Sequence, residues 1–261
     1  MPEQVLIDAV LPAGGTSDPD FAAVSGSPIK ALIKFPDKTI LENVAGAMHG
    51  SSQIRRTVII GSELVRPIAE KLDCFWVEEG KSGPENIFKG LDYLNEQPDP
   101  PSHILIATTD IPFITTAHVD WLLGHLSTRK DIYVPCVRET DFIALYEGCP
   151  ATFVKMKNDS FTLGGMFLYD AKVLQRVRPH IERIFNQRKS LLGMAKLVGP
   201  VFAFKLLTRM LVIQDVENKV GAVLQCQGSA VLDCPAELAF DVDDAEDYSY
   251  GMQWVKDHPR T

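Results

Sequence analysis

Residues 5–15 read VLIDAVLPAGG, a short apolar run that passes directly into Pro12-Ala13-Gly14-Gly15. A brief apolar run bounded by Pro and Gly is typical of a β-strand followed by a turn. A strand that is covered on both faces needs no alternation of polar and apolar residues. The stretch therefore predicts a buried strand over Val5–Leu11 that ends in a glycine turn.

The same kind of strand recurs through the first half of the chain, with helical spacing between the strands. The helix expected over Thr39–Met48 begins with a capping-box pattern, in which Thr39 precedes Glu42 by three residues. The further expected elements are a strand at Thr57–Ile60, a helix at Glu63–Leu72, a strand at Cys74–Val77, a helix at Pro84–Leu94, a strand at His103–Ala107, a helix at Thr115–Leu126 and a strand at Asp131–Val137. This alternation predicts an α/β fold, a three-layer α/β/α sandwich with a mostly parallel sheet.

The second half is less regular. We expect a strand over Phe161–Tyr169 with Gly164-Gly165 inside it, a helix over Ala171–Gln187, one or two helices over Leu191–Met210, a last strand over Leu238–Val242 and a final helix over Ala245–Val255. No linker or repeat interrupts the sequence. We therefore predict one domain over residues 1–261 with a helical elaboration around residues 171–212.

Composition excludes several classes of function. The chain has 261 residues and a formal net charge of −8, and its Lys and Arg residues form no long run, so no nucleic-acid partner is expected. None of the five Cys residues forms a CxxC pair, which favours reduced thiols in a cytoplasmic protein. The apolar stretch Leu191–Val212 contains Lys196, Lys205 and Arg209, which argues against a transmembrane span.

The first candidate site is the turn at Gly14-Gly15 together with Lys30. Glycines let backbone N–H groups approach a ligand closely, and successive N–H groups form an anion-binding concavity. A lysine adds a point charge for phosphate. The alternative is an ordinary turn with a surface lysine.

The second candidate is Asp110, which follows the strand His103–Ala107 almost directly. Ligands of such sheets gather at the carboxyl ends of the strands, and a carboxylate there can hold Mg²⁺. Alternation also places Asp241 and Asp243 on one face of the expected last strand, from which Asp243 could meet Asp110. The alternatives are a turn cap for Asp110 and, for Asp244–Asp247, an acidic helix start that suits the helix dipole.

In this order, the pieces resemble the MobA-like nucleotidyltransferases, of the molybdenum-cofactor guanylyl- and cytidylyltransferase type. The matching segments are Leu11–Gly15, Ser27–Ile33 with Lys38–Glu42, Gly83–Asn86 ahead of Gly90-Leu91, Asp110–Phe113 and Asp241–Asp247. The resemblance extends over nearly the whole chain. It implies a Rossmann-like sandwich of the glycosyltransferase-A (GT-A) type.

The resemblance also implies a reaction and its residues. A nucleoside monophosphate passes from a nucleoside triphosphate to a phosphorylated small-molecule acceptor, with release of pyrophosphate and with Mg²⁺ as cofactor. The implied roles are nucleotide binding by Leu11, Ala13, Gly14, Gly15, Lys30 and Asn86, catalysis by Lys30 and Asp110, and metal binding by Asp110 and Asp243. Arg188 and Lys189 are candidates for binding the acceptor, with exposed surface charge as the alternative.

One departure keeps other functions open. The family's loop carries an Arg soon after its glycines, whereas no Arg lies between Gly15 and Lys30 here. A non-catalytic nucleotide-binding module is therefore one alternative. A GT-A glycosyltransferase is another, although Thr108-Thr109-Asp110 lacks the first Asp of a DxD motif.

Residues 191–212 could contact a lipid acceptor, with a core helix as the alternative. The base, the acceptor and the oligomeric state stay open, a homo-oligomer included.

Overall fold

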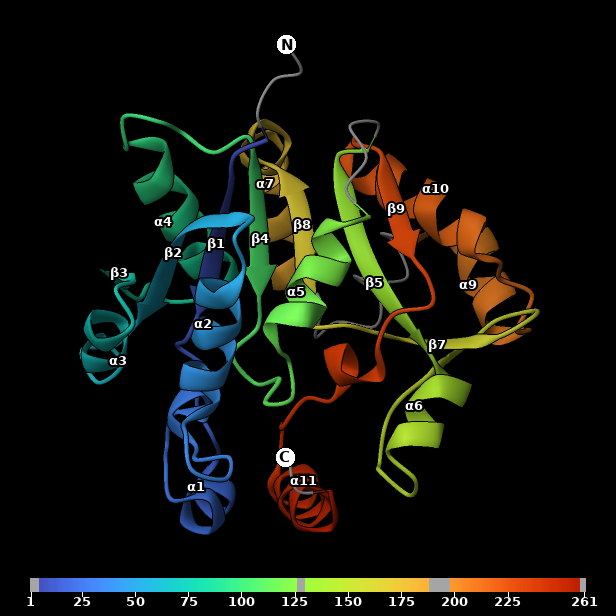
Figure 1. Cartoon of the computed structure of the whole chain (residues 1–261). Helices are drawn as coiled ribbons and strands as arrows, with labels where there is room; N and C mark the ends of the chain where they lie inside the picture. The colour runs from blue at the N-terminus through green and yellow to red at the C-terminus, as the bar shows by residue number, and fades with distance from the viewer. Residues whose placement is uncertain (1–4, 126–129, 188–197, 259–261) are drawn as a thin grey trace.

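The computed structural model describes residues 5–125, 130–187 and 198–258, and it is built around one nine-stranded sheet (Figure 1). Four strands run parallel in the first half: β1 (Ile7–Pro12), β2 (Ile54–Gly61), β3 (Phe75–Glu78) and β4 (His103–Ala107). The second half adds β5 (Ile132–Arg138), β6 (Val154–Lys155), β7 (Ser160–Leu163), β8 (Met166–Asp170) and β9 (Gly228–Val231). The strand order is β3-β2-β1-β4-β8-β5-β7-β6, and β9 pairs with β5.

Helices cover both faces of this sheet, which confirms the three-layer α/β/α prediction. On one side lie α2 (Ile40–Gly50) and α5 (Thr116–Leu123), and on the other lie α4 (Gly83–Asn95) and α7 (Ala171–Gln187). Strand β1 contributes Ala9 and Leu11 to one core and Val10 to the other. The absence of polar alternation in its sequence thus reflects burial on both faces.

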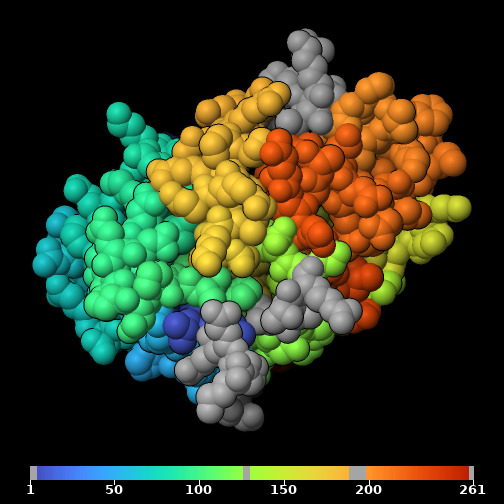
Figure 2. Space-filling model, turned by 90° about the horizontal axis from the view of Figure 1, so that it is seen from above, coloured from blue at the N-terminus to red at the C-terminus, as the bar shows by residue number. Residues whose placement is uncertain are grey.

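The remaining helices surround this sandwich. They are α1 (Pro19–Ser25), α3 (Arg66–Lys71), α6 (Glu139–Leu145), α9 (Pro200–Leu207), α10 (Ile213–Leu224) and α11 (Ala245–Asp257), with 3-10 turns η1 (Lys30–Leu32) and η2 (Ala236–Ala239). Helices α7 and α10 lie side by side at the end of the molecule seen in Figure 2. No helix within the described ranges has the length and apolarity needed to cross a bilayer.

The first-half elements are confirmed, including the capping box between Thr39 and Glu42. The prediction of a mostly parallel sheet is correct only for the strands of the first half. In the second half, β8 is antiparallel to β4 and β5, and β7 is antiparallel to β5 and β6. The single strand expected over Phe161–Tyr169 is two strands, β7 and β8, because the chain leaves the ladder at Gly164-Gly165. The sheet is therefore mixed.

The prediction of a strand over Leu238–Val242 is wrong. The segment begins as the turn η2, and its residues Leu238, Phe240 and Val242 are buried while Asp241 and Asp243 are exposed. Ala239 is buried as well, so burial alternates only from Phe240 onward. The backbone bonds of the segment go to loops: Val242 N–H donates to the Asp110 carbonyl at 2.9 Å, and the Leu238 carbonyl accepts from Gly165 N–H at 2.7 Å. Periodicity alone cannot distinguish a paired strand from an extended segment packed on loops.

Other second-half expectations had mixed outcomes. The helices at Ala171–Gln187 and Ala245–Asp257 are present, as is α9 within the helical stretch expected over Leu191–Met210. Residues 191–197 of that stretch lie outside the described ranges. Helix α10 and strand β9 were not expected. The division of the chain into one domain with a helical elaboration stays a prediction.

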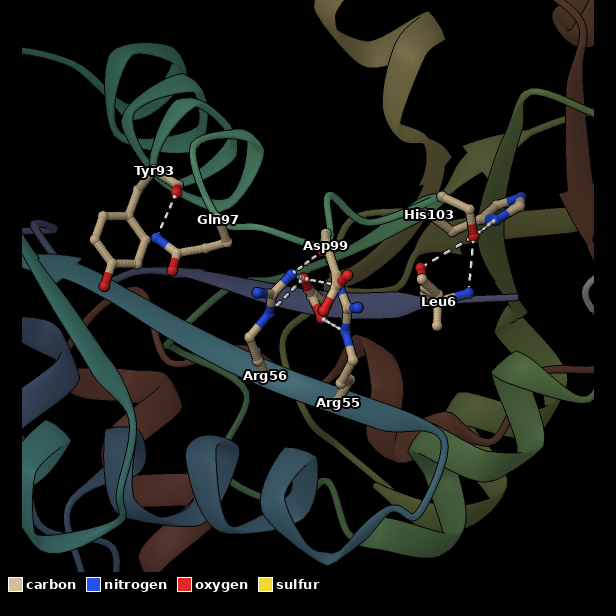
Figure 3. A network of polar contacts seen from close by, with 9 residues as sticks. Leu6, Arg55, Arg56, Tyr93, Gln97, Asp99 and His103 are labelled. Atoms are coloured by element: carbon tan, nitrogen blue, oxygen red, sulfur yellow. Dashed lines mark hydrogen bonds and ion pairs between the residues drawn. The ribbon is translucent and has the colours of Figure 1, made fainter. Parts of the chain in front are cut away.

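A buried ion cluster joins β1 and β2 at the amino end of the sheet. The Asp8 side chain is fully buried and accepts four hydrogen bonds, of 2.8–3.0 Å, from the guanidinium groups of Arg55 and Arg56. Successive strand residues normally point to opposite faces. Here the register shifts, so that Ile7 pairs with Ile54 and Asp8 pairs with Arg56, which leaves Arg55 as the extra residue of a bulge. Both guanidinium groups therefore reach one carboxylate, and both also donate to the Asp99 carbonyl (Figure 3).

Helix α4 lies close to β1 and β2 because residue 90 is glycine. A Cβ atom at Gly90 would lie 2.8 Å from Ile60 Cδ1 and 2.8 Å from Val10 Cγ1. We expect Gly90→Ala to lower the free energy of unfolding by about 1–3 kcal/mol, the usual cost of overpacking. Gly46→Ala in α2 is the matched control, since its Cβ would meet nothing within 4 Å. The control should stabilise the helix by roughly 0.5–1 kcal/mol. Denaturant unfolding measures both, and equal effects of the two substitutions would contradict the packing argument.

Candidate active site

The glycine turn after β1 and the residue Lys30 lie against each other, as the sequence predicts. Lys30 N–H donates to the Gly15 carbonyl at 2.9 Å, and an antiparallel bridge joins Thr16 to Ile29. A Cβ atom at Gly15 would be 3.9 Å from Lys30 Cβ and Cδ. The turn and the lysine therefore form one wall at the carboxyl end of β1.

Asp110 lies beside this wall, after the carboxyl end of β4. Its loop is fixed to the first one because Thr109 Oγ1 donates to the Pro12 carbonyl at 2.8 Å. Asp110 Oδ1 is buried and has no hydrogen-bond partner among the described residues. Such a group is costly unless a ligand completes it. The buried oxygen thus marks a place for a cation or a donor group.

Asp243 comes to the same place from the C-terminal segment. Its carboxylate forms a 2.6 Å salt bridge with Lys30 Nζ, and the lysine side chain is 19% exposed against 62% for Asp243. The hydrogen bond from Val242 N–H to the Asp110 carbonyl holds the two segments together. The structure therefore brings Asp110, Asp243 and Lys30 together.

Burial and neighbouring carboxylates change the acidity of this group. Burial raises the pKa of Asp110, and Asp243 adds to that shift, while a hydrogen bond with Thr108 and the charge of Lys30 oppose it. Asp241 keeps contact with solvent, but the surrounding protein removes part of the water from its carboxyl. This desolvation, followed by the negative charges of Asp110 and Asp243, raises the pKa of Asp241 to about 7. Burial is the largest cause of both shifts, and the negative charge of the neighbouring carboxylates adds to it. A bound cation would offset that charge.

A cavity of about 420 Å³ opens between these loops and the start of α4. Its lining consists of Pro12, Gly14, Gly15, Thr16, Lys30, Glu79, Gly80, Lys81, Ser82, Gly83, Asn86, Thr108, Thr109 and Asp110. In Figure 1 the strand β4 points toward the lower edge, and this is the edge at which the cavity lies. The carboxyl ends of parallel strands are the usual ligand edge of such a sheet.

Two of the residues implied for nucleotide binding are not in the lining. Leu11 and Ala13 are fully buried in the core, and Ala13 N–H donates a hydrogen bond to the Ile60 carbonyl at 2.7 Å. These two residues support the loop from below. Asn86 is in the lining, with its Oδ1 accepting from Gly80 N–H at 2.6 Å. Arg188 and Lys189 lie outside the described residues.

The cavity also contains residues that were not expected from the sequence, namely Thr16 and the segment Glu79–Ser82. Residues 79–82 follow the carboxyl end of β3, just as Gly14 follows β1 and Asp110 follows β4. Applying the carboxyl-end rule to every parallel strand would have found them. Glu79 and Lys81 add one charge of each sign to the cavity wall.

The donor set fits a magnesium ion only in part before a nucleotide binds. Among the residues that the structure describes, no three His, Cys, Asp or Glu side chains are arranged as a metal site. Mg²⁺ with nucleotides usually needs only one or two protein carboxylates, since phosphates and water complete its octahedron. Asp110, whose buried oxygen has no partner in the part of the chain that the structure describes, and Asp243 could supply these.

Solved structures share this fold. A hypothetical transferase from Thermus thermophilus is 24% identical, covers 94% of this chain and 99% of its own, and has a TM-score of 0.79. A CMP:2-keto-3-deoxy-manno-octonic acid synthetase complexed with CTP is 11% identical, with coverage of 97% and 99% and a TM-score of 0.60. A 4-diphosphocytidyl-2C-methyl-D-erythritol synthase from Anaerococcus prevotii is also 11% identical, with coverage of 97% and 96% and a TM-score of 0.59. At these identities the likeness shows the fold alone.

The sequence itself carries the family relationship. A search of the curated proteins finds no match. Residues 9–193, however, match the MobA-like NTP transferase domain, a span that runs from the first strand through the glycine turn, Lys30, the start of α4 and Asp110. The chain thus belongs to the MobA-like NTP transferase family of nucleotidyltransferases.

Proposed function

We propose that the protein transfers a nucleoside monophosphate from a nucleoside triphosphate to a phosphorylated small-molecule acceptor and releases pyrophosphate. The observation that carries this proposal is one cavity that combines the Gly14-Gly15 turn, Lys30 and the buried Asp110 oxygen, which has no hydrogen-bond partner among the described residues. A polyphosphate with a divalent cation is the ligand that matches such a wall. The CTP complex of the synthetase with the same fold supports nucleotide binding in this architecture.

In the proposed reaction an oxygen of the acceptor attacks the α-phosphorus of the triphosphate. The new P–O bond forms as the bond from the α-phosphorus to the bridging oxygen breaks, and pyrophosphate carries away that electron pair. Catalysis of this step rests on positioning and charge neutralisation. Gly14 and Gly15 would let the phosphates approach the backbone, and Lys30 would neutralise part of their charge. Asp110 and Asp243 would hold Mg²⁺, which when bound supplies charge neutralisation and a template for the phosphates.

Lys81 would take the place of the missing Arg of the family loop. Lys81 joins the lining from the segment after β3, so the cavity wall carries two lysines, Lys30 and Lys81. A lysine binds phosphate as a point charge, without the bidentate geometry of an arginine. Acceptor binding by Arg188 and Lys189 remains part of the proposal.

Pyrophosphate release tests the reaction directly. The intact chain would be incubated with each of the four nucleoside triphosphates, with and without Mg²⁺, and with a panel of phosphorylated sugars and alcohols. We expect release that requires the cation, one nucleotide and one acceptor together. Hydrolysis of a sugar nucleotide, with no pyrophosphate from any triphosphate, would favour a glycosyltransferase instead.

Lys30→Ala is expected to weaken triphosphate binding by about ten- to a hundred-fold. The reason is the loss of a half-buried, charge-assisted contact, worth roughly 1.5–3 kcal/mol. Calorimetric titration with Mg²⁺ and a triphosphate measures the change. Lys34→Ala is the control, since Lys34 is exposed and outside the cavity lining. Unchanged nucleotide affinity in Lys30→Ala would remove Lys30 from the phosphate site.

A further inference from the structure

Helix α9 presents an apolar surface to solvent at the outer edge of the molecule, beside α10 (Figure 1). It buries none of its side chains against the part of the chain that the structure describes. Val201, Phe204 and Leu207 recur at every third position, which places them along one side of the helix, and Leu207 is 84% exposed. Together with exposed neighbours they form the α9 face, which consists of Val201, Phe204, Leu206, Leu207, Met210 and Val212. A contiguous exposed apolar surface marks a site of interaction.

Unpaired positive charge lies at both ends of the α9 face. Lys219 is at the amino end, because its Nζ would be 4.0 Å from a Cβ atom at Gly199, the residue that precedes α9. Arg209 follows the carboxyl end of the helix. Neither of these two side chains forms a hydrogen bond or an ion pair with another described residue. An apolar side of a helix that is bordered by free cations is typical of a helix that lies on a lipid surface.

Carboxylates do not cancel this positive charge. In the sequence, no Asp or Glu occurs between Glu182 and Asp215, although the whole chain carries a net charge of −8. Asp215 is engaged by Lys205 in a 2.6 Å salt bridge. The carboxylate of Glu217 is turned to β9, where it accepts from Ala230 N–H at 2.9 Å. The α9 face is therefore an apolar surface with a local excess of positive charge on an acidic protein.

This combination of charge and apolarity distinguishes between two possible occupants of the face. In a two-fold dimer the same patch lies on both sides of the contact, so the excess positive charge would meet itself. An anionic membrane complements both properties, since acyl chains accept the apolar side chains and headgroup phosphates pair with the cations. A cavity of about 390 Å³ between α9 and α10, lined in part by Phe202 and Lys219, leaves room for a headgroup next to the apolar residues.

We propose that the α9 face docks on the surface of a membrane that contains anionic lipids, with Arg209 and Lys219 paired with headgroup phosphates. The eight residues of α9 form a helix about 12 Å long, less than half the thickness of the hydrocarbon core, so the contact is an attachment to the surface. The inference is independent of the proposed function, because it concerns where the protein is held and makes no use of the nucleotide cavity.

Flotation of the intact chain with lipid vesicles in a density gradient tests the proposal. The probes are vesicles of phosphatidylcholine alone and mixed vesicles of phosphatidylcholine and phosphatidylglycerol. The wild type is expected to float with the mixed vesicles and to do so less well with phosphatidylcholine alone. Added salt should reduce flotation with the mixed vesicles, because it screens the attraction between the cations and the anionic headgroups.

Phe204→Glu and Leu207→Glu should each lower the partition into mixed vesicles by about ten-fold or more, the factor for keeping one large apolar side chain out of the lipid. Leu64→Glu is the matched control. Leu64 is 63% exposed, as is Phe204, but it precedes α3 on the opposite side of the molecule (Figure 1). This control should float like the wild type.

Arg209→Gln separates the electrostatic part of the contact from the apolar part. It should lower the partition into mixed vesicles by about five-fold, the factor for one cation near an anionic surface, and leave partition into phosphatidylcholine unchanged. Absence of wild-type flotation with mixed vesicles, or equal flotation of the wild type and Phe204→Glu, would overturn the proposal. Sedimentation velocity without lipid examines the other occupant, and a wild-type dimer that Phe204→Glu converts to a monomer would assign the α9 face to a second copy of the chain instead. Each of these outcomes leaves the proposed function in place.

Discussion

Asp110→Asn is expected to keep the fold and to reduce Mg²⁺-dependent pyrophosphate release by about a thousand-fold. Asn matches Asp in size but lacks the charge that holds a hard cation. Losing the neutralisation of a triphosphate in the transition state costs several kcal/mol, and about 4 kcal/mol corresponds to this factor. The measurement is the initial rate of pyrophosphate release with the nucleotide and acceptor that the wild type uses.

The same substitution should leave stability unchanged or increase it. Burial raises the pKa of Asp110 in the folded chain, so at neutral pH its ionised form disfavours folding. The destabilisation is absent below the carboxyl's unfolded pKa and is present at higher pH, and Asn removes it. We therefore expect a melting temperature at pH 7 that is equal to or above that of the wild type. Asp37→Asn, at an exposed position outside the cavity, is the control and should alter neither property. A pyrophosphate signal that survives Asp110→Asn would refute the assignment of the metal site.

Asp8→Ala is expected to lower the free energy of unfolding by about 3 kcal/mol without a direct effect on the cavity. The change removes the acceptor of four hydrogen bonds and leaves Arg55 and Arg56 together without their carboxylate. Removing one partner of a buried ion pair typically costs about 3–5 kcal/mol. The lower end applies here because the two arginine side chains are 28% and 17% exposed and can regain some solvent. Urea unfolding monitored by circular dichroism gives the value.

Asp99→Ala provides the control for this cluster. Arg55 and Arg56 donate to the backbone carbonyl of Asp99, which the substitution retains. Its effect should stay below about 1 kcal/mol, as for exposed charges. If Asp8→Ala proved no more destabilising than this control, the cluster would hold β1 and β2 together far less than its geometry indicates.

Local patterns were sufficient for the parts of the site that lie next to regular elements. The Gly14-Gly15 turn follows β1 and Asp110 follows β4, and the carboxyl-end rule predicts from the sequence that both lie at one edge of the sheet. Asn86 was found through the family motif at the start of α4. The same motif also suggested Leu11 and Ala13, which the fold uses in the core. A sequence motif does not say which of its residues contact ligand and which support the loop.

The alternation around Asp241 and Asp243 predicts correctly that Asp243 lies at the ligand edge of the sheet, but it wrongly predicts that the segment is a β-strand. Leu238, Phe240 and Val242 are buried as strand residues would be, but their segment bonds to the Asp110 and Gly165 loops. The burial pattern depends on side-chain chemistry alone, whereas pairing depends on which backbone lies alongside.

The sequence by itself determined the alternation of strands and helices in the first half, the three layers and the glycine turn, because periodicity and turn chemistry act over a few neighbouring residues. Only the tertiary structure decided that Lys30 meets Asp243, 213 positions away, and that Glu79 faces Gly14. It also decided that a bulge turns Arg55 and Arg56 onto Asp8. These contacts join segments that are distant in the chain, and local propensity carries no information about the distance between them. The packing of the sheet and its loops sets that distance, and with it the charge and hydrogen-bonding pattern that a ligand meets.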